Sequence, residues 1–137
     1  DGGTYGLVLP PLNSFQYAGP GDSLEIMGVQ GGPGFRTNLA LIDSAPSFVT
    51  TVTPRVRVEL FDGADRLLLG FEVDVPSAGG VQLGDIFRNQ GLGDGPEVGW
   101  IRVTGIRGLV GGFASMLDNT TNDPTYLGAV LASSPSP

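Results

Sequence analysis

The chain of 137 residues contains no cysteine, no histidine and no lysine, and all seven of its basic residues are arginines. Without cysteine the fold cannot rest on a disulfide framework, and no thiolate is present to act as a nucleophile. Without histidine the chain lacks the commonest transition-metal ligand and the usual general base at neutral pH. These absences exclude thiol chemistry and any metal centre built on cysteine or histidine.

Positive charge and long hydrophobic runs are also scarce. The net charge is −7, whereas nucleic acids and anionic membrane surfaces are bound through basic stripes. No apolar run reaches the ~18 residues that a bilayer-spanning helix needs. The chain opens without a charged segment followed by an apolar one, so we expect that any signal peptide has been removed. The expectation is an extracellular or cell-surface protein with neither nucleic acid as a partner nor membrane insertion.

The composition is that of a folded domain rich in turns. Apolar residues make up 40% of the chain and charged residues 15%, which is enough to build a core at this length. Glycine and proline are frequent, with 23 and 11 residues. We therefore expect one domain made of many short elements.

The clearest predicted strand is residues 55–61, in which the apolar Val56 and Val58 alternate with charged residues such as Arg57. Such a period of two is typical of a half-buried strand. A turn sequence at residues 62–65 leads into a second alternating run at residues 67–75, and together they predict a β-hairpin.

The remaining apolar runs are also short. Strands are predicted at residues 35–43 and, more weakly, at 23–29, and a second hairpin is predicted from residues 99–105 and 109–117. Residues 84–91 are typical of one helical turn near 85–90. This pattern predicts an all-β fold, a single Ig-like or jelly-roll-type β-sandwich of about eight short strands. Its fully buried residues are predicted to be Val56, Val58, Leu60, Leu69, Phe71, Val73, Ile101 and Val103.

Nearly the same phrase stands at both ends of the chain. Residues 4–9 read TYGLVL and residues 125–131 read TYLGAVL. Two interchangeable apolar strands are suited to β-strand addition, in which an end of one copy fills a sheet edge of the next. The residues predicted to form this subunit interface are Thr4, Tyr5, Leu7 and Leu9.

The predicted organisation follows from this idea. Residues 1–17 form an N-terminal strand segment, residues 18–132 the β-sandwich, and residues 133–137 a tail rich in proline and serine. The turn-rich residues 18–21 are expected to act as a hinge that lets the N-terminal segment reach a neighbour.

An oxygen-rich segment follows the predicted strand 109–117. Asp118, Asn119, Asn122 and Asp123 carry the carboxylate and amide oxygens that Ca²⁺ prefers. The spacing differs from that of an EF-hand, and the same residues are favoured in turns. The segment is therefore either a calcium site or a strand-connecting turn.

Two further groups have a functional and a structural interpretation. Glu72 and Asp74 lie on one face of a strand, where paired acids either do acid–base chemistry or keep a sheet edge soluble. Because no other parts of an active site accompany them, the sequence predicts no enzyme. The aromatic residues Trp100, Tyr5, Tyr17 and Tyr126 either stack on sugar rings or pack within the protein.

Several segments resemble a repeat module of large secreted bacterial surface proteins. They are residues 35–41 (FRTNLAL), 59–62 (ELFD), 82–87 (QLGDIF), 114–126 (ASMLDNTTNDPTY) and 3–6 (GTYG), the last of which often closes one unit in such arrays. The resemblance implies an extracellular, Ig-like sandwich without an assigned activity. Because these 137 residues correspond to one unit and not to a tandem array, we expect association between separate chains in place of covalent linkage to neighbouring units.

Together these features predict a secreted structural protein whose copies associate, through strand donation, into a filament or a surface layer. The alternative is an adhesion module of a cell-surface protein that binds carbohydrate or calcium, with a surface glycan as its partner.

Overall fold

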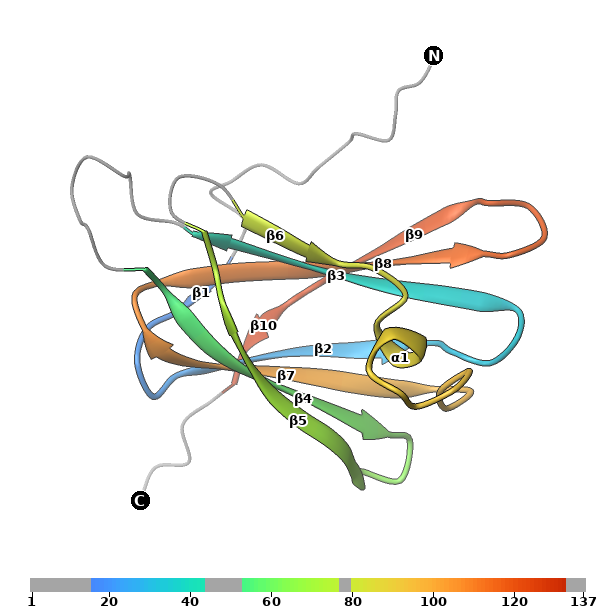
Figure 1. The fold of residues 1–137 in the computed structure, drawn as a ribbon, viewed down its shortest axis with the longest axis horizontal. Helices are drawn as coiled ribbons and strands as arrows, with labels where there is room; N and C mark the ends of the chain where they lie inside the picture. The colour runs from blue at the N-terminus through green and yellow to red at the C-terminus, as the bar shows by residue number, and fades with distance from the viewer. Residues whose placement is uncertain (1–15, 44–52, 77–79, 133–137) are drawn as a thin grey trace, which may run out of the picture.

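The computed structural model describes residues 16–43, 53–76 and 80–132, which form two antiparallel sheets packed face to face (Figure 1). This confirms the predicted all-β sandwich, with ten strands and one short helix in the described residues. They are β1 (Tyr17–Ala18), β2 (Ser23–Val29), β3 (Phe35–Asp43), β4 (Arg55–Asp62), β5 (Leu67–Asp74), β6 (Gly80–Leu83), α1 (Ile86–Asn89), β7 (Gly99–Arg107), β8 (Val110–Asp118), β9 (Pro124–Gly128) and β10 (Val130–Leu131).

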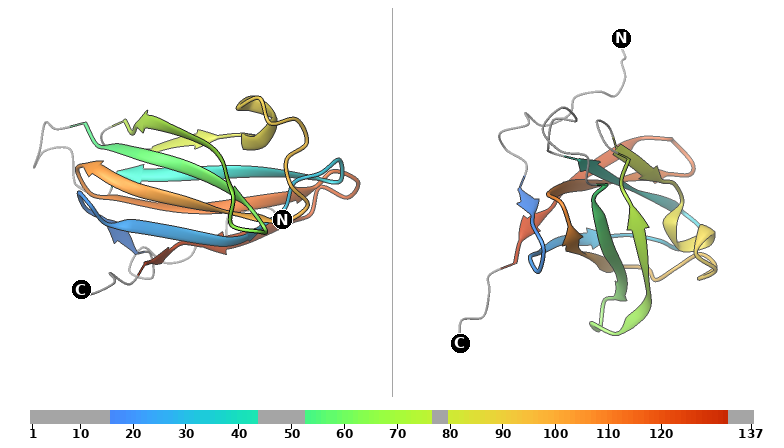
Figure 2. Two further views of the ribbon diagram at one scale, coloured as in Figure 1. Left: turned by 90° about the horizontal axis from the view of Figure 1, so that it is seen from below. Right: turned by 60° about the vertical axis from the view of Figure 1, so that its left-hand side comes forward.

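The two sheets differ in how their edges are built. In the first, which we call sheet A, β8 is central, with β3 and then β6 on one side. Its other side is shared by β1 and β9. In sheet B the order is β10-β2-β7-β4-β5. The views in Figure 2 show the two layers from other directions.

The predicted hairpin of β4 and β5 is confirmed, with Val58 opposite Phe71 in an antiparallel register. Val56, Val58 and Leu60 are fully buried between the sheets. The side chains that alternate with them are only partly covered, as a half-buried strand requires.

The prediction that Leu69, Phe71 and Val73 are fully buried is wrong. All three are only half-buried, although they pack against the core. Because β5 is the last strand of sheet B, its inward side chains have neighbours on one side only. Ile101 and Val103, on the central strand β7, are fully buried as predicted.

The predicted hairpin of residues 99–105 and 109–117 is also wrong. β7 lies in sheet B and β8 in sheet A, so the two strands face each other across the core without pairing. Both sides of β7 are occupied by β2 and β4. The two-residue connection between β7 and β8 contains Gly108 in the left-handed region (φ 80°), as a hairpin turn would. It nevertheless carries the chain from one sheet to the other.

The helical turn predicted near residues 85–90 is confirmed as α1, which closes one end of the space between the sheets (Figure 2). Ile86 and Phe87 are its buried residues. A Cβ atom at Gly95 (φ 80°) would collide with the Phe87 ring. Glycine is therefore required there for the chain to pass close to this ring.

The predicted hinge at residues 18–21 is wrong, because this segment is held firmly. Ala18 is fully buried, and β1 pairs with β8, so the sandwich already begins at Tyr17. The Gly21 N–H donates to the Gly105 carbonyl (2.9 Å), and the Gly105 N–H donates to the Asp22 carbonyl (2.9 Å).

Candidate functional site

The C-terminal copy of the repeated phrase is paired within its own chain. β9 adds to β8 in sheet A, and β10 then adds to β2 in sheet B. The predicted single strand is therefore divided at Ala129, where the chain crosses between sheets. The predicted interface residues Thr4, Tyr5, Leu7 and Leu9 lie outside the described residues. Only the N-terminal copy thus remains a candidate for donation.

The outer edge of β5 is the longest sheet edge without a partner strand in the described part of the chain. β5 pairs only with β4 and has eight residues, whereas the edge strand β6 has four. The Val75 N–H donates to the Pro54 carbonyl (2.8 Å) and so points toward the strand that contains β4. Because successive residues of a strand point their backbone groups to opposite sides, those of Gly70, Glu72 and Asp74 point outward. This edge offers N–H and C=O groups to another strand.

Two acids of β5 are held on the outer face of sheet B. Arg55 donates to Glu72 (2.9 Å) and to Asp74 (2.7 Å). These hydrogen bonds, the one to Asp74 foremost, raise the pKa of the Arg55 guanidinium above its usual range. The carboxylate pair noted in the sequence is therefore bridged by one guanidinium, with Arg107 as a second cation near Asp74 (3.7 Å), an arrangement that suits a solvated sheet face better than acid–base catalysis.

The segment from Asp118 to Asp123 forms the turn of the β8–β9 hairpin. One carboxylate oxygen of Asp118 accepts from the N–H groups of Thr120 (2.7 Å) and Thr121 (3.2 Å). The Asn122 N–H donates to the Asp118 carbonyl (2.7 Å), and Asn122 has a left-handed backbone (φ 63°). These are the bonds of a turn that closes on itself.

The amide oxygens of the same turn face a cation of the protein. Arg36 donates to the side-chain oxygen of Asn119 (2.8 Å) and, more weakly, to that of Asn122 (3.4 Å). Across the described residues, no three acidic, histidine or cysteine side chains gather as ligands for a metal would. The structure thus brings Asp118, Asn119 and Asn122 onto one turn, but directs the amide oxygens toward a guanidinium.

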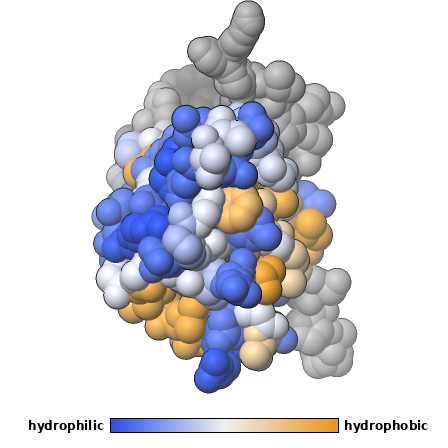
Figure 3. All heavy atoms as spheres, turned by 90° about the vertical axis from the view of Figure 1, so that its right-hand side faces the viewer, coloured by the Kyte–Doolittle hydropathy of each residue, from blue (hydrophilic) through white to orange (hydrophobic). Residues whose placement is uncertain are grey.

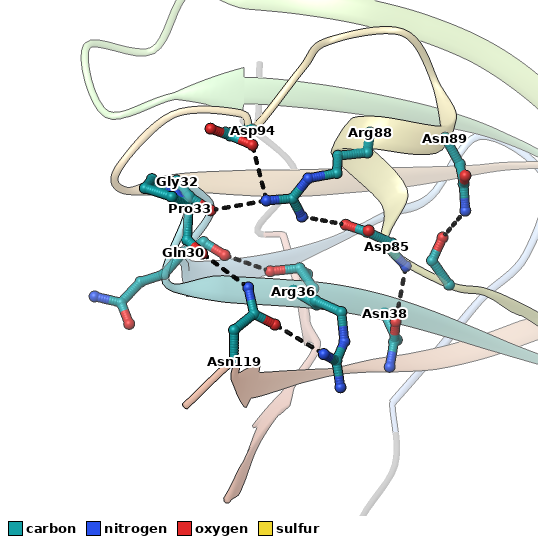
Figure 4. A network of polar contacts seen from close by, with 12 residues as sticks. Gln30, Gly32, Pro33, Arg36, Asn38, Asp85, Arg88, Asn89, Asp94 and Asn119 are labelled. Carbon is teal, nitrogen blue, oxygen red and sulfur yellow. Dashed lines mark hydrogen bonds and ion pairs between the residues drawn. The ribbon is translucent and has the colours of Figure 1, made fainter. Parts of the chain in front are cut away.

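The neighbouring loops are joined by a second polar network, shown in Figure 4. Arg88 of α1 donates to Asp85 (3.0 Å) and to Asp94 (2.8 Å), bonds that raise its pKa, with Asp85 as the larger cause. It also donates to the Gly32 carbonyl (3.3 Å). The Asp85 N–H donates to the Asn38 side chain (2.8 Å), which ties α1 to β3. This network positions the loops around α1, which closes this end of the space between the sheets.

The same end of the sandwich carries an open hollow, lined by Glu97 and by residues 30–35. Figure 3 looks onto this end and shows a mainly hydrophilic surface with separate apolar patches. Its lining includes three glycines, one proline and a single acidic side chain. The hollow offers little convergent chemistry for a small ligand.

The β4–β5 turn is stabilised by Asp62. Its carboxylate accepts from the N–H groups of Ala64 and Arg66 (both 2.9 Å) and pairs with the Arg66 side chain (3.1 Å). These bonds, the Arg66 backbone N–H foremost, lower the pKa of Asp62 against the opposing effect of burial. The Asp62 carboxylate stabilises the hairpin turn, as its position in a turn sequence predicted.

Trp100 is packed within the protein and does not form an open platform. Its ring lies flat on Phe61 (centroids 4.1 Å apart, planes 6° apart), and Arg102 lies over both rings. The indole N–H donates to Asp65 (2.8 Å). Trp100 is only 8% exposed, so a sugar ring has no free face of it to stack on.

Comparison with protein-family models, with curated proteins and with solved structures gives no match. In the described residues, no helix has the length and apolar character needed to cross a membrane. A function for this chain is therefore inferred from its own geometry.

Proposed function

We propose that this chain is an extracellular structural subunit, whose copies join by adding an N-terminal strand of one copy to the β5 edge of the next. The proposal rests on the outer edge of β5, which has no partner strand among the described residues. An exposed regular edge is a hazard in a soluble protein unless something covers it or the protein uses it. The acidic composition, rich in glycine, serine, threonine and proline, and the resemblance to bacterial surface repeats support the extracellular setting.

The inner face of the edge strand supports the same proposal. Leu69, Phe71 and Val73 are half-buried at successive inward positions of β5. In residues 4–9, Tyr5, Leu7 and Leu9 recur with the same period of two. A strand added in register would place these side chains beside those of β5 and extend the core by one strand.

The energies indicate how strong such a junction would be. Burying three apolar side chains contributes about 1.5–3 kcal/mol each. Each backbone hydrogen bond adds about 0.5–1.5 kcal/mol net. Association costs an estimated 4–15 kcal/mol, so a six-residue strand gives a junction of modest strength. Because donor and acceptor sites are different surfaces, the contact is heterologous and propagates into a fibre.

No described feature gives comparable support to an adhesion module. The amide oxygens of the β8–β9 turn face Arg36, and Trp100 is covered. An adhesion module that binds a surface glycan or Ca²⁺ is therefore the weaker of the two proposed functions.

Replacing Glu72 with proline tests the open edge. The Glu72 N–H points outward and is not used by the β4–β5 ladder, so Glu72→Pro removes a donor only from an incoming strand. We expect the Glu72→Pro chain to stay folded and to lose assembly, as measured by light scattering and electron microscopy.

The matched control is Glu72→Ala, which removes the same ion pair with Arg55 but keeps the N–H. It should assemble as the unchanged chain does. Equal assembly by both variants would mean that the β5 edge is not the junction.

A further inference from the structure

A row of apolar side chains crosses the outer face of sheet B. Met27 lies opposite Trp100, Trp100 opposite Phe61, and Phe61 opposite Leu67, so the row runs over four neighbouring strands. The middle pair is buried and stacked, while Met27 and Leu67 are 57% and 51% exposed. We call these four residues the apolar row.

The rest of this face carries charges of both signs in equal number. The four acids are Glu25, Glu59, Glu72 and Asp74, and the four bases are Arg55, Arg57, Arg102 and Arg107. The other described residues hold nine acids and only three arginines (Arg36, Arg66 and Arg88). The outer face of sheet B is thus nearly neutral even with Asp65, which accepts from Trp100 of the apolar row, whereas the other described residues are strongly acidic.

This distribution indicates which partner the face suits. Elsewhere on the surface, two copies of the chain repel each other, whereas a strongly basic or acidic partner gains no net attraction from a neutral face. Opposite signs alternate across it, as where Arg102 stands between Glu25 and Glu59 in register. A second copy that packs face to face presents the same alternating charges. A small shift between the two faces then places the arginines of one copy opposite the acids of the other.

We infer that the outer face of sheet B is a lateral contact, where a second copy of this chain packs its own apolar row. The inference deepens the proposed function, because strand addition alone extends in one direction and a layer or bundle needs a second interface. Sheets that pack face to face lie about 10 Å apart, which lets Met27 and Leu67 of one copy reach the row of the other.

The size of the face sets the expected affinity. Four strands spaced about 4.8 Å apart, each contributing about seven residues, cover roughly 450 Å² per copy. Two such faces bury less than the ~1,000 Å² expected of a stable specific interface. The contact is therefore weak between single copies, and it becomes strong only when many copies in two filaments engage together.

The experiment uses the full chain with Tyr5, Leu7 and Leu9 replaced by threonine, which disables the donor strand and changes no residue of the outer face of sheet B. Sedimentation equilibrium over a range of concentrations should show reversible dimers. Adding Met27→Glu, which places a charge in the apolar row, should weaken the dimer at least tenfold.

The matched control is Leu131→Glu, which adds the same charge on β10. Leu131 is 42% exposed and lies opposite the buried Leu24, so it is not on the outer face. This variant should dimerise as the parent with the three threonines does.

Two outcomes would overturn the inference: a monomer at every concentration in the parent with the three threonines, or equal weakening by Met27→Glu and Leu131→Glu. Failure of strand addition is seen separately, as assembly of the parent with the three threonines into filaments. In chains that can form filaments, Met27→Glu should leave single filaments that no longer bundle.

Discussion

Truncating Phe87 to alanine is expected to lower the free energy of unfolding by about 3–5 kcal/mol, the usual cost of deleting a buried aromatic ring. Phe87 is 2% exposed and belongs to the core between the sheets. Its environment cannot collapse easily, because the Gly95 backbone and the network around Arg88 hold the surrounding loops in place. Urea denaturation of the Phe87→Ala chain measures the loss.

The matched comparison is Phe71→Ala. Phe71 is the same residue type and also packs against the core, but it lies on the edge strand β5 and is half-buried. Its truncation should cost about 1–2 kcal/mol, because less apolar area is removed from water and the site opens toward solvent. Equal losses at the two positions would contradict the assignment of β5 as an open edge.

Deleting residues 1–12 is expected to abolish assembly and leave a soluble, folded chain. The first described strand begins at Tyr17 and the described core at Ala18, so the deletion removes none of the described strands. The chain would lose the donor strand and keep the acceptor edge. Light scattering and electron microscopy measure the loss of assembly, and circular dichroism checks the fold.

The matched control keeps the segment but replaces Tyr5, Leu7 and Leu9 with threonine, which retains strand propensity and removes the apolar side chains. This chain should also fail to assemble. A synthetic peptide of residues 1–12 should bind the deleted chain. If the deleted chain assembles as the full one does, residues 4–9 are not the donor.

Much of the fold could be predicted from local pattern. The alternation from Arg55 to Leu60 predicted both a strand and its buried face. The turn sequence at residues 62–65 predicted that the next strand is its hairpin partner. The α1 turn was also predictable, because Gly91 follows a short apolar pair that has Asp85 before it.

The errors share one physical cause, which is that strand pairing is decided by distant residues. The connection at Gly108 has the sequence of a hairpin turn. However, β7 and β8 pair with strands far away in the sequence and so lie in opposite sheets. In the same way, the alternation of Leu69, Phe71 and Val73 predicts an inward face but not a position at the sheet edge.

The candidate interfaces were accessible to sequence reasoning only in part. The repeated terminal phrase suggested strand donation, but only the structure shows the C-terminal phrase divided between β9 and β10. The apolar row is invisible in the sequence, because Met27, Phe61, Leu67 and Trp100 become neighbours only through the register of four strands.

Disulfide formation between copies is the sharpest test of strand addition at the β5 edge. The chain has no cysteine of its own, so every introduced thiol is the only one in its chain. One set of chains carries a cysteine at a single position from 4 to 9, and an isotopically labelled chain carries Glu72→Cys. The two are mixed, allowed to assemble and oxidised, and mixed disulfides are counted by mass spectrometry.

Glu72 lies on the outer face of β5, so a strand added to this edge places alternate residues beside it. The account predicts mixed disulfides with cysteine at positions 4, 6 or 8, on the face opposite Tyr5, Leu7 and Leu9, and few at positions 5, 7 or 9. Absence of disulfides between copies, or equal yields at all six positions, would contradict strand addition at the β5 edge.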